Sequence, residues 1–239
     1  TTFGGHRRHL HLVLPNEVWT RLRRGAKARG RTANDALVAV LGVCWARIRE
    51  TRGLPRTAFT YGLAADLRGR LGAAEDVGVT NFASLVFPWI PKRHVGQPGY
   101  IDALLSASAP RLTATGGAAP LYASFLAMKA VPTRVLERWA ETASLTSLAL
   151  KAVPVGLSNC GRLPTELAEW GGVPLRRNHI LGPILGPPTV VVVATGWAGD
   201  CELTFNFIDG SLGELGEAAF LGHVRDAVDE VSDALDPRA

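Results

Sequence analysis

The stretch that organises this chain reads Tyr61-Gly62-Leu63-Ala64-Ala65-Asp66-Leu67-Arg68-Gly69-Arg70, and Val77-Gly78-Val79-Thr80-Asn81-Phe82 follows it shortly afterwards. The aromatic and aliphatic residues of 57–65 predict a buried strand. Charged residues come directly after that strand, where they are costly unless they are paired or face a cleft. Two interpretations follow: a solvated surface turn, or a strand end that carries a functional site.

The composition is typical of a soluble globular protein. Of the 239 residues, 47% are hydrophobic and 20% are charged, which is enough for a sizeable core. No apolar run is long enough to span a bilayer, and no basic-then-apolar leader opens the chain. Cys44, Cys160 and Cys201 have no metal-ligand spacing, so we expect no disulfide framework and a reducing, cytoplasmic location. Because the chain starts at Thr1 and its only methionine is Met128, either an initiator methionine was removed or the chain is a piece of a longer one.

The net charge of +5 comes almost entirely from arginine, which is concentrated in residues 7–31 and 47–70. A mildly basic surface suits a phosphate-bearing cofactor or an acidic protein partner. No aromatic-interleaved basic motif and no recognition-helix signature accompanies the charge, so nucleic acid is not the favoured partner.

The first half of the chain predicts a strand followed by two helices. Residues 7–14 alternate, with leucines on one face and His9 and His11 on the other. Without a third ligand, that pair indicates a half-exposed strand face and not a metal site. Asn16 is expected to cap a helix that runs to residue 29 and is stopped by Gly30. Thr32 caps the next helix, in which the residues of the buried stripe are Leu37, Val40, Leu41, Cys44, Trp45 and Ile48.

The second half predicts a mixture of strands and helices. An apolar segment over 77–90 contains one amide, Asn81, which must bridge strands or face a cavity. Helices are expected over 97–117 and 121–147, a strand over 153–159, and irregular structure over 174–188. Strands 189–195 and 201–208 form a hairpin with a five-residue loop, and the last helix buries Leu221, Val224, Val228, Val231 and Leu235. We therefore predict one α/β domain, residues 1–239, with a mixed sheet covered by helices.

The common catalytic motifs are absent from the sequence. It contains no phosphate-binding loop, dinucleotide fingerprint, nucleophile elbow or metal-binding His-Glu-x-x-His, and the histidines His94, His179 and His223 are isolated in the sequence. No catalytic residue and no metal ligand is predicted within this chain.

Several motifs follow one another in an order that is familiar from one superfamily. They are Arg29-Gly30-Arg31-Thr32-Ala33-Asn34-Asp35-Ala36-Leu37, Asp66-Leu67-Arg68-Gly69-Arg70, Gly78-x-x-Asn81 and Leu157-Ser158-Asn159-Cys160-Gly161-Arg162-Leu163, followed by a final strand and helix. With them the chain resembles the C-terminal lobe of the condensation-domain and acyl-CoA-dependent acyltransferase superfamily, whose fold is chloramphenicol acetyltransferase-like. The resemblance covers essentially the whole chain but about half of the length usual in that family.

The resemblance implies a function in acyl transfer. The family's signature, His-His-x-x-x-Asp-Gly, supplies the general base, lies in the N-terminal lobe, and is absent here. By the same resemblance, Asp66 and Arg68 support the contact with that lobe, whereas Asn81, Ser158 and Asn159 line the substrate channel. The implied donor is an acyl-CoA or phosphopantetheine thioester that is not tightly bound, and the acceptor is a small molecule with a hydroxyl or amine. The implied partners are an N-terminal catalytic lobe and an acyl carrier protein.

Three functions remain open at this point. The chain is the C-terminal lobe of an acyltransferase or condensation enzyme, a non-catalytic module that binds a carrier protein or another partner, or an unrelated small α/β enzyme with a scattered site. As a lobe without its base, it is expected to be inactive alone.

Overall fold

The computed structural model describes residues 5–66, 83–107, 126, 129–149, 155–163, 169–174, 176–177, 179–184 and 189–236, with the backbone alone for 65–66, 83–86, 143–149 and 170. Its centre is a mixed seven-stranded sheet of order β1-β9-β8-β5-β2-β3, with β4 paired to β2. The strands are β1 (Arg7–Leu14), β2 (Phe59–Asp66), β3 (Ala83–Val86), β4 (Trp89–Ile90), β5 (Val155–Arg162), β8 (Val190–Trp197) and β9 (Asp200–Ile208). β5 runs parallel to β2 and β8, and the other described pairs are antiparallel. The predicted mixed α/β sheet is confirmed.

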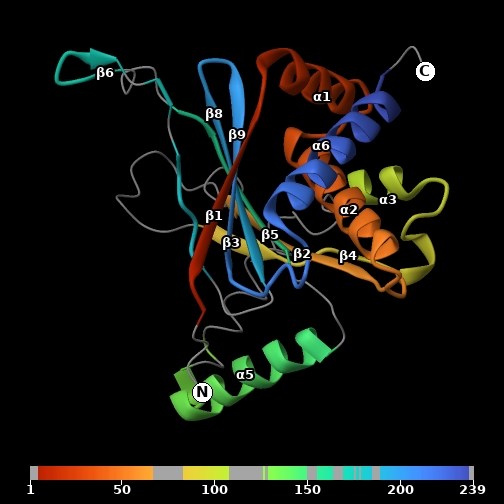
Figure 1. The fold of residues 1–239 in the computed structure, drawn as a ribbon, viewed down its shortest axis with the longest axis vertical. Coiled ribbons are helices and arrows are strands. Elements are labelled where there is room, and N and C mark those ends of the chain that lie inside the picture. Colours follow the sequence, from red (N-terminus) through yellow and green to blue (C-terminus); the bar gives the residue numbers. More distant parts are fainter. Residues whose placement is uncertain are drawn as a thin grey trace.

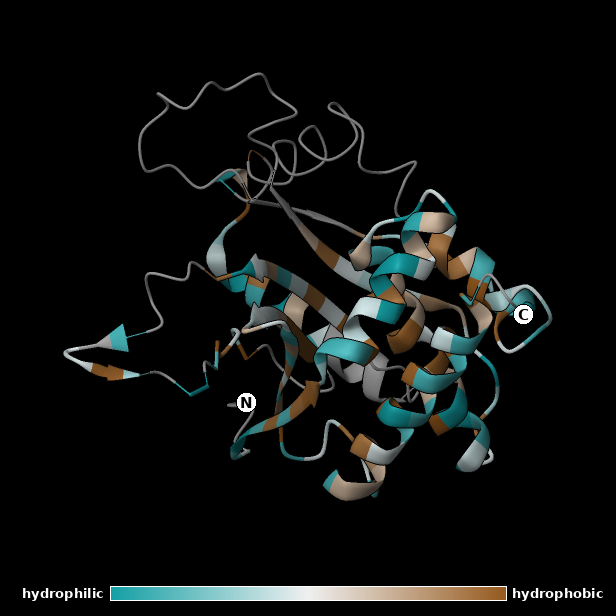
Figure 2. Ribbon diagram, turned by 90° about the horizontal axis from the view of Figure 1, so that it is seen from above, coloured by the Kyte–Doolittle hydropathy of each residue, from teal (hydrophilic) through white to brown (hydrophobic). Residues whose placement is uncertain are grey.

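Helices cover one face of this sheet. They are α1 (Asn16–Ala28), α2 (Ala33–Thr51), α3 (Tyr100–Ser106) and α6 (Glu217–Ala234), which lie together on one side of the strands (Figure 1). In Figure 2 these helices carry hydrophilic residues outward and hydrophobic residues toward one another and the sheet. Phe205 of β9 meets Phe220 of α6 edge to face at 5.1 Å between ring centroids, deep in the resulting core.

The predicted start of α2 is confirmed in detail. The Thr32 hydroxyl accepts a hydrogen bond from the Asp35 backbone N–H, and the Asp35 carboxylate accepts one from the Thr32 backbone N–H, which together form a capping box. The helix is buried over nearly all of residues 35–44, a wider surface than the predicted stripe, because α3 and α6 also pack against it. Burial raises the pKa of the Cys44 thiol, as expected of a core cysteine.

The predicted end of α1 is confirmed, but its predicted start is wrong. Gly30, at φ +67°, lets its N–H and that of Arg31 bond back to the carbonyls of Lys27 and Ala26. At the other end Asn16 is the first helical residue and not the cap. Its backbone N–H donates instead to the Asp200 carboxylate at 2.8 Å, so a residue distant in sequence satisfies this N-terminus.

The hairpin of β8 and β9 is confirmed with a shorter loop than predicted. The strands continue to Trp197 and from Asp200, which leaves only Ala198 and Gly199 in the turn. Both residues have positive φ, +49° and +98°, and this two-residue geometry matches the twist of the paired strands. The prediction of a five-residue loop is therefore wrong.

Two predicted helices differ from the observed ones. The segment 97–117 becomes helical only at Tyr100, because Gly99 takes φ +80° just before it, and residues 108–117 lie outside the described part. The single helix over 121–147 is wrong where it is described, because Pro132 precedes the start of α5 (Thr133–Ala149) and proline is disfavoured inside a helix. The described side chains of α5 are mostly exposed, including Trp139 at 65%.

A small hairpin of β6 (Glu169–Trp170) and β7 (Val173–Pro174) was not predicted. Gly171 and Gly172, both at positive φ, form its turn. In both ribbon views it projects away from the sheet and helices (Figures 1 and 2). Among the described helices none is both long and apolar enough to cross a membrane.

Candidate functional site

The structure describes only part of the predicted site. Asp66 is the last residue of β2, and its side chain is not described, while Arg68 and Asn81 lie outside the described residues. Ser158 and Asn159 are both on β5, which is parallel to β2 with Leu63 beside Leu157. Because the carboxyl ends of parallel neighbours meet at the same sheet edge, the backbones of Asp66 and Asn159 lie at the same edge.

Ser158 and Asn159 point to opposite faces of the sheet. Asn159 pairs with Ala194, which belongs to the core beneath the helices, whereas Ser158 pairs with Val193, which lies outside that core. Successive side chains of a strand alternate between its two faces. The two predicted channel residues therefore cannot line the same surface of the sheet.

The Asn159 amide joins the end of β5 to the start of α2. Its Nδ2 donates to Asn34 Oδ1 at the start of α2 over 2.6 Å, and its Oδ1 accepts from the Gly161 backbone N–H over 2.9 Å. Gly161 takes φ +71°, and the register to β8 shifts between Asn159 and Arg162. A bulge of this kind bends its strand, here at the carboxyl end of β5.

A hollow of about 560 Å³ opens where β5, the β8–β9 hairpin and α1 meet. Trp19 and Trp197 form apolar walls, and Arg23, Arg24 and Arg162 line it without an ion pair to any described residue. The remaining lining residues are Asn16, Thr20, Ala33, Asn159, Gly161, Gly196, Gly199, Asp200 and Cys201. Since the Asp200 carboxylate is already bound at the α1 N-terminus, the hollow favours an anionic ligand.

The hollow contains no activated nucleophile among its described residues. Burial raises the pKa of Cys201 to about 12, so its thiol stays protonated at neutral pH. No described group of three His, Cys, Asp or Glu side chains is arranged to hold a metal ion. The arrangement can therefore bind and orient a ligand, and the carboxylate of Asp200, the acidic group among its described lining residues, is held by the Asn16 N–H.

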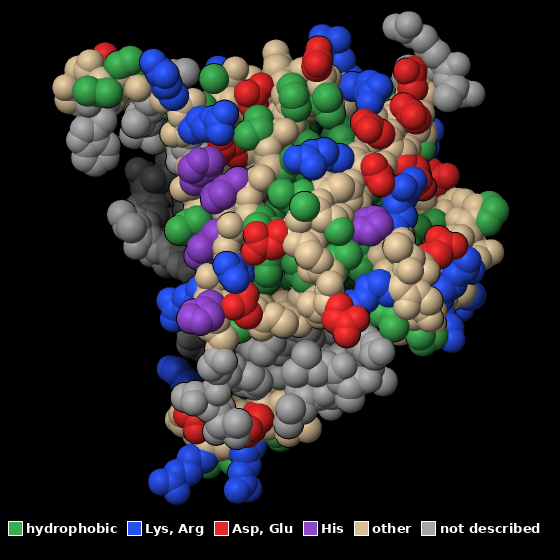
Figure 3. All heavy atoms as spheres, viewed as in Figure 1, with side chains coloured by type: hydrophobic (Ala, Val, Ile, Leu, Met, Phe, Trp, Pro, Cys, Tyr) green, Lys and Arg blue, Asp and Glu red, His purple; other side chains and the backbone are tan. Residues whose placement is uncertain are grey.

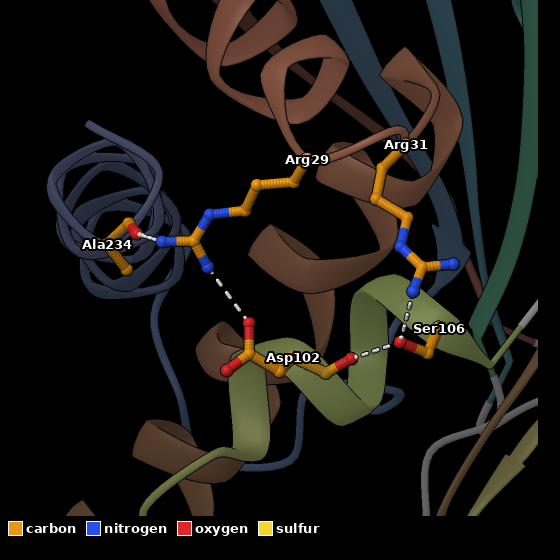
Figure 4. A network of polar contacts seen from close by, with 5 residues as sticks. All are labelled: Arg29, Arg31, Asp102, Ser106 and Ala234. Carbon is orange, nitrogen blue, oxygen red and sulfur yellow. Dashed lines mark hydrogen bonds and ion pairs between the residues drawn. The ribbon is translucent and has the colours of Figure 1, made fainter. Parts of the chain in front are cut away.

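Arg29 and Arg31 serve the packing of helices and not this hollow. The Arg29 guanidinium donates to the Ala234 carbonyl at the end of α6 and to Asp102 on α3 at 2.9 Å, whereas Arg31 donates to Ser106 at 3.0 Å (Figure 4). They tie the α1–α2 turn to α3 and α6. This part of the motif is structural.

A second polar cluster lies on the face of the sheet opposite the helices. Glu202, Thr204 and Asn206 of β9 are buried there, and β1 places His11 beside Thr204 and His9 beside Asn206. The segment 179–184 covers part of this face, since the Gly182 backbone N–H donates to Asn206 Oδ1 at 3.2 Å and a β carbon there would lie only 2.7 Å from Val193.

Sequence reasoning missed this cluster because its members come from three distant segments. A signal was present in Cys201-Glu202-Leu203-Thr204-Phe205-Asn206-Phe207, in which polar and apolar residues alternate. Pairing that pattern with the alternation around His9 and His11 would have brought the polar faces together.

Comparison with known proteins gives a likeness of fold. No protein-family model and no curated protein matches the sequence. The epimerization domain from the third module of tyrocidine synthetase B is similar at 13% identity and TM-score 0.59, over 98% of this chain and 50% of that one. The wax ester synthase/diacylglycerol acyltransferase from Marinobacter aquaeolei VT8 is similar at 16% sequence identity and TM-score 0.57, over 96% of this chain and 49% of that one. TRI101 of F. sporotrichioides, complexed with coenzyme A and T-2, is similar at 12% sequence identity and TM-score 0.57, over 93% of this chain and 49% of that one.

The chain thus spans about half the length of these structures. At such low identity the likeness concerns the fold, which agrees with the resemblance seen in the sequence. The chain has the chloramphenicol acetyltransferase-like α/β fold, similar to that of condensation domains and acyltransferases.

Proposed function

We propose that this chain is the C-terminal half of a two-lobe acyltransferase or condensation enzyme. The observation that carries the proposal is that nearly the whole chain matches less than half, between 42% and 49%, of a wax ester synthase/diacylglycerol acyltransferase, a condensation-domain structure and the PapA2 acyl transferase. The enzyme transfers an acyl group from a thioester to the hydroxyl or amine of a small molecule. Its general base comes from the other half, which carries His-His-x-x-x-Asp-Gly.

The arginine-lined hollow supports a phosphate-bearing donor, which is either acyl-CoA or the phosphopantetheine of a carrier protein. Arginine guanidinium groups bind phosphate oxygens by charge-assisted hydrogen bonds. Arg23, Arg24 and Arg162 surround the hollow, and the Trp197 wall offers apolar contact to a pantetheine chain. That TRI101 is complexed with coenzyme A is consistent with this choice.

We assign to the other half the sheet edge at the ends of β2 and β5, where Asp66 and Asn159 lie, and the resemblance adds Arg68 and Asn81 to that face. Arg68 pairs there with the signature aspartate, and Asn81 and Asn159 border the channel. Because the base is elsewhere, we expect this chain alone not to transfer acyl groups between natural substrates at enzymatic rates, since loss of general-base catalysis costs about 10²–10⁴-fold.

Titration calorimetry with coenzyme A and dephospho-coenzyme A tests the donor site. The wild-type chain should bind coenzyme A, and added salt should weaken binding. Arg23→Gln and Arg162→Gln should each weaken it roughly tenfold, as expected for one charge-assisted contact. Arg225→Gln is the matched control, because Arg225 is an exposed arginine on α6 that does not line the hollow.

The outcomes separate the alternatives. Equal affinity of all three variants for coenzyme A would remove the hollow as the donor site. Failure to bind coenzyme A, together with capture of an acylated carrier protein, would assign the donor to a carrier. If neither coenzyme A nor an acylated carrier protein binds, even when the other half is present, the chain is a non-catalytic binding module and not half of an acyltransferase.

A further inference from the structure

The arginine-lined hollow contains a single carboxylate among its described lining residues, that of Asp200. Arg23, Arg24 and Arg162 line the same hollow, and none of them forms an ion pair with a described residue. A carboxylate beside exposed guanidinium groups ordinarily pairs with one of them. Asp200 instead accepts a hydrogen bond from the Asn16 backbone N–H at 2.8 Å, where α1 begins.

A neighbouring arginine of the same helix behaves differently. Arg21 lies 3.8 Å from the carboxylates of both Asp229 and Asp233. These acids belong to α6, over which Asp and Glu side chains gather in Figure 3. Arginines that face α6 thus find acidic partners, whereas the carboxylate and the arginines of the hollow stay apart.

Local contacts fix the opposite charges of the hollow without cancelling them. The hairpin tip rests on the start of α1, since a β carbon on Gly199 would lie only 3.1 Å from Asn16 Cγ. The N-terminus of a helix stabilises a carboxylate but compensates only part of its charge. On the other side, the Arg23 guanidinium lies 5.9 Å from the centroid of the Trp19 ring, a contact that orients the cation and leaves its charge in place.

The hollow is small enough for Asp200 to act on any anion inside it. A volume of about 560 Å³ corresponds to roughly 10 Å across, which is about the Debye length at 0.1 M salt. Two unit charges about 10 Å apart in water interact strongly enough to change an affinity roughly twofold. The repulsion from Asp200 therefore grows with the number of charges that a ligand brings into the hollow.

We propose that Asp200 is a selectivity residue, which narrows the preference of this hollow for the more highly charged of the two phosphate-bearing donors. The choice of donors rests on the proposed function. Free acyl-CoA carries a diphosphate and a 3′-phosphate, whereas the pantetheine of a carrier protein is attached through one phosphodiester. The three arginines favour the free coenzyme, and the Asp200 carboxylate offsets part of that advantage. The hollow thereby accepts a carrier-linked donor as well as free acyl-CoA.

Titration calorimetry of Asp200→Asn with ligands of increasing phosphate charge tests this role. The ligands are pantetheine, which is uncharged, dephospho-coenzyme A, which has the diphosphate, and coenzyme A, which adds the 3′-phosphate. At low salt the substitution should leave the affinity for pantetheine unchanged, raise that for dephospho-coenzyme A roughly threefold, and raise that for coenzyme A up to about tenfold. Because the effect is electrostatic, the gain should disappear at about 0.5 M salt.

Two controls separate the local charge from helix capping and from the net charge of the chain. Asp200→Ala should raise the affinity for coenzyme A as much as Asp200→Asn does, although it loses the cap and melts at a lower temperature. Glu214→Gln removes one negative charge from an exposed side chain beyond the other end of β9. A strand of this length spans about 30 Å, well over a Debye length at 0.1 M salt, so this variant should bind coenzyme A like the wild type.

Equal affinity of Asp200→Asn and the wild type for coenzyme A, or an equal gain in Glu214→Gln, would overturn the proposal. The result is separable from the proposed function, because inorganic pyrophosphate probes the hollow without a donor. If coenzyme A fails to bind but pyrophosphate binds, and binds more tightly to Asp200→Asn, the donor assignment falls and the selectivity residue stands. If neither coenzyme A nor pyrophosphate binds, both fall.

Discussion

Replacing Asn159 with alanine should destabilise the end of β5 and the adjacent hollow together. The change removes the 2.6 Å bond to Asn34 and the 2.9 Å bond from the Gly161 N–H. A net hydrogen bond contributes about 0.5–1.5 kcal/mol, and the Gly161 bond is exposed, so the expected loss is about 1–2 kcal/mol. For a chain of this size that lowers the melting temperature by roughly 2–8 °C.

A double-mutant cycle with Asn34→Ala isolates the bond between the two side chains. Thermal melts of the single and double variants should show a coupling of about 0.5–1.5 kcal/mol, because both single changes remove the same contact. Ser158→Ala is the control, since its side chain lies on the other face of β5 and its change should stay within about 0.5 kcal/mol. Additive effects of Asn34→Ala and Asn159→Ala would refute the contact as a source of stability.

Three further changes test other parts of the structure. Asp200→Ala should lower the free energy of unfolding by about 0.5–2 kcal/mol, measured by thermal melts, because it leaves the N-terminus of α1 uncapped. Asp200→Asn should lower it less, and equal losses for the two variants would contradict the capping role. Because the folded state lowers the pKa of His11 below its ordinary 6.5, protonating it opposes folding, so stability should be full above pH 6.5 and fall on acidification below it. Melting temperatures at pH 8 and pH 5 should therefore differ less for His11→Asn than for the wild type, and parallel curves would count against this. Arg68→Ala should barely change the melt of this chain yet sharply reduce activity with the other half, since an unpaired buried carboxylate costs about 3–5 kcal/mol; unfolding of the chain alone would assign Arg68 to its own lobe.

The sequence by itself determined the elements whose signals are local. The alternation around Leu10 and Leu12 predicts a half-exposed strand, Thr32 and Asp35 predict a capping box, and Gly30 predicts a helix end; all three are observed. The two helix-end signals work because the groups that satisfy the backbone lie within five residues of it, and the strand signal works because alternation reports the two faces of the strand residue by residue. The ordered motifs also indicated the fold that the comparisons show.

Only the tertiary structure decided which distant groups meet. Asp200 caps α1 across most of the chain, which displaced Asn16 from its predicted role, and the paired twist of β8 and β9 shortened their loop. That Ser158 and Asn159 face opposite sides follows from their adjacency in a strand, but the register of β5 against β8 decided which side each one takes: Asn159 lies beside Ala194 on the helix-covered face and Ser158 beside Val193 on the other. His179 looked isolated in the sequence because its partner, Glu202, whose carboxylate lies 3.0 Å from its Nδ1, belongs to a strand whose position depends on long-range pairing. Strand order, register and the burial of a carboxylate arise from contacts between segments far apart in the chain, and no local pattern specifies them.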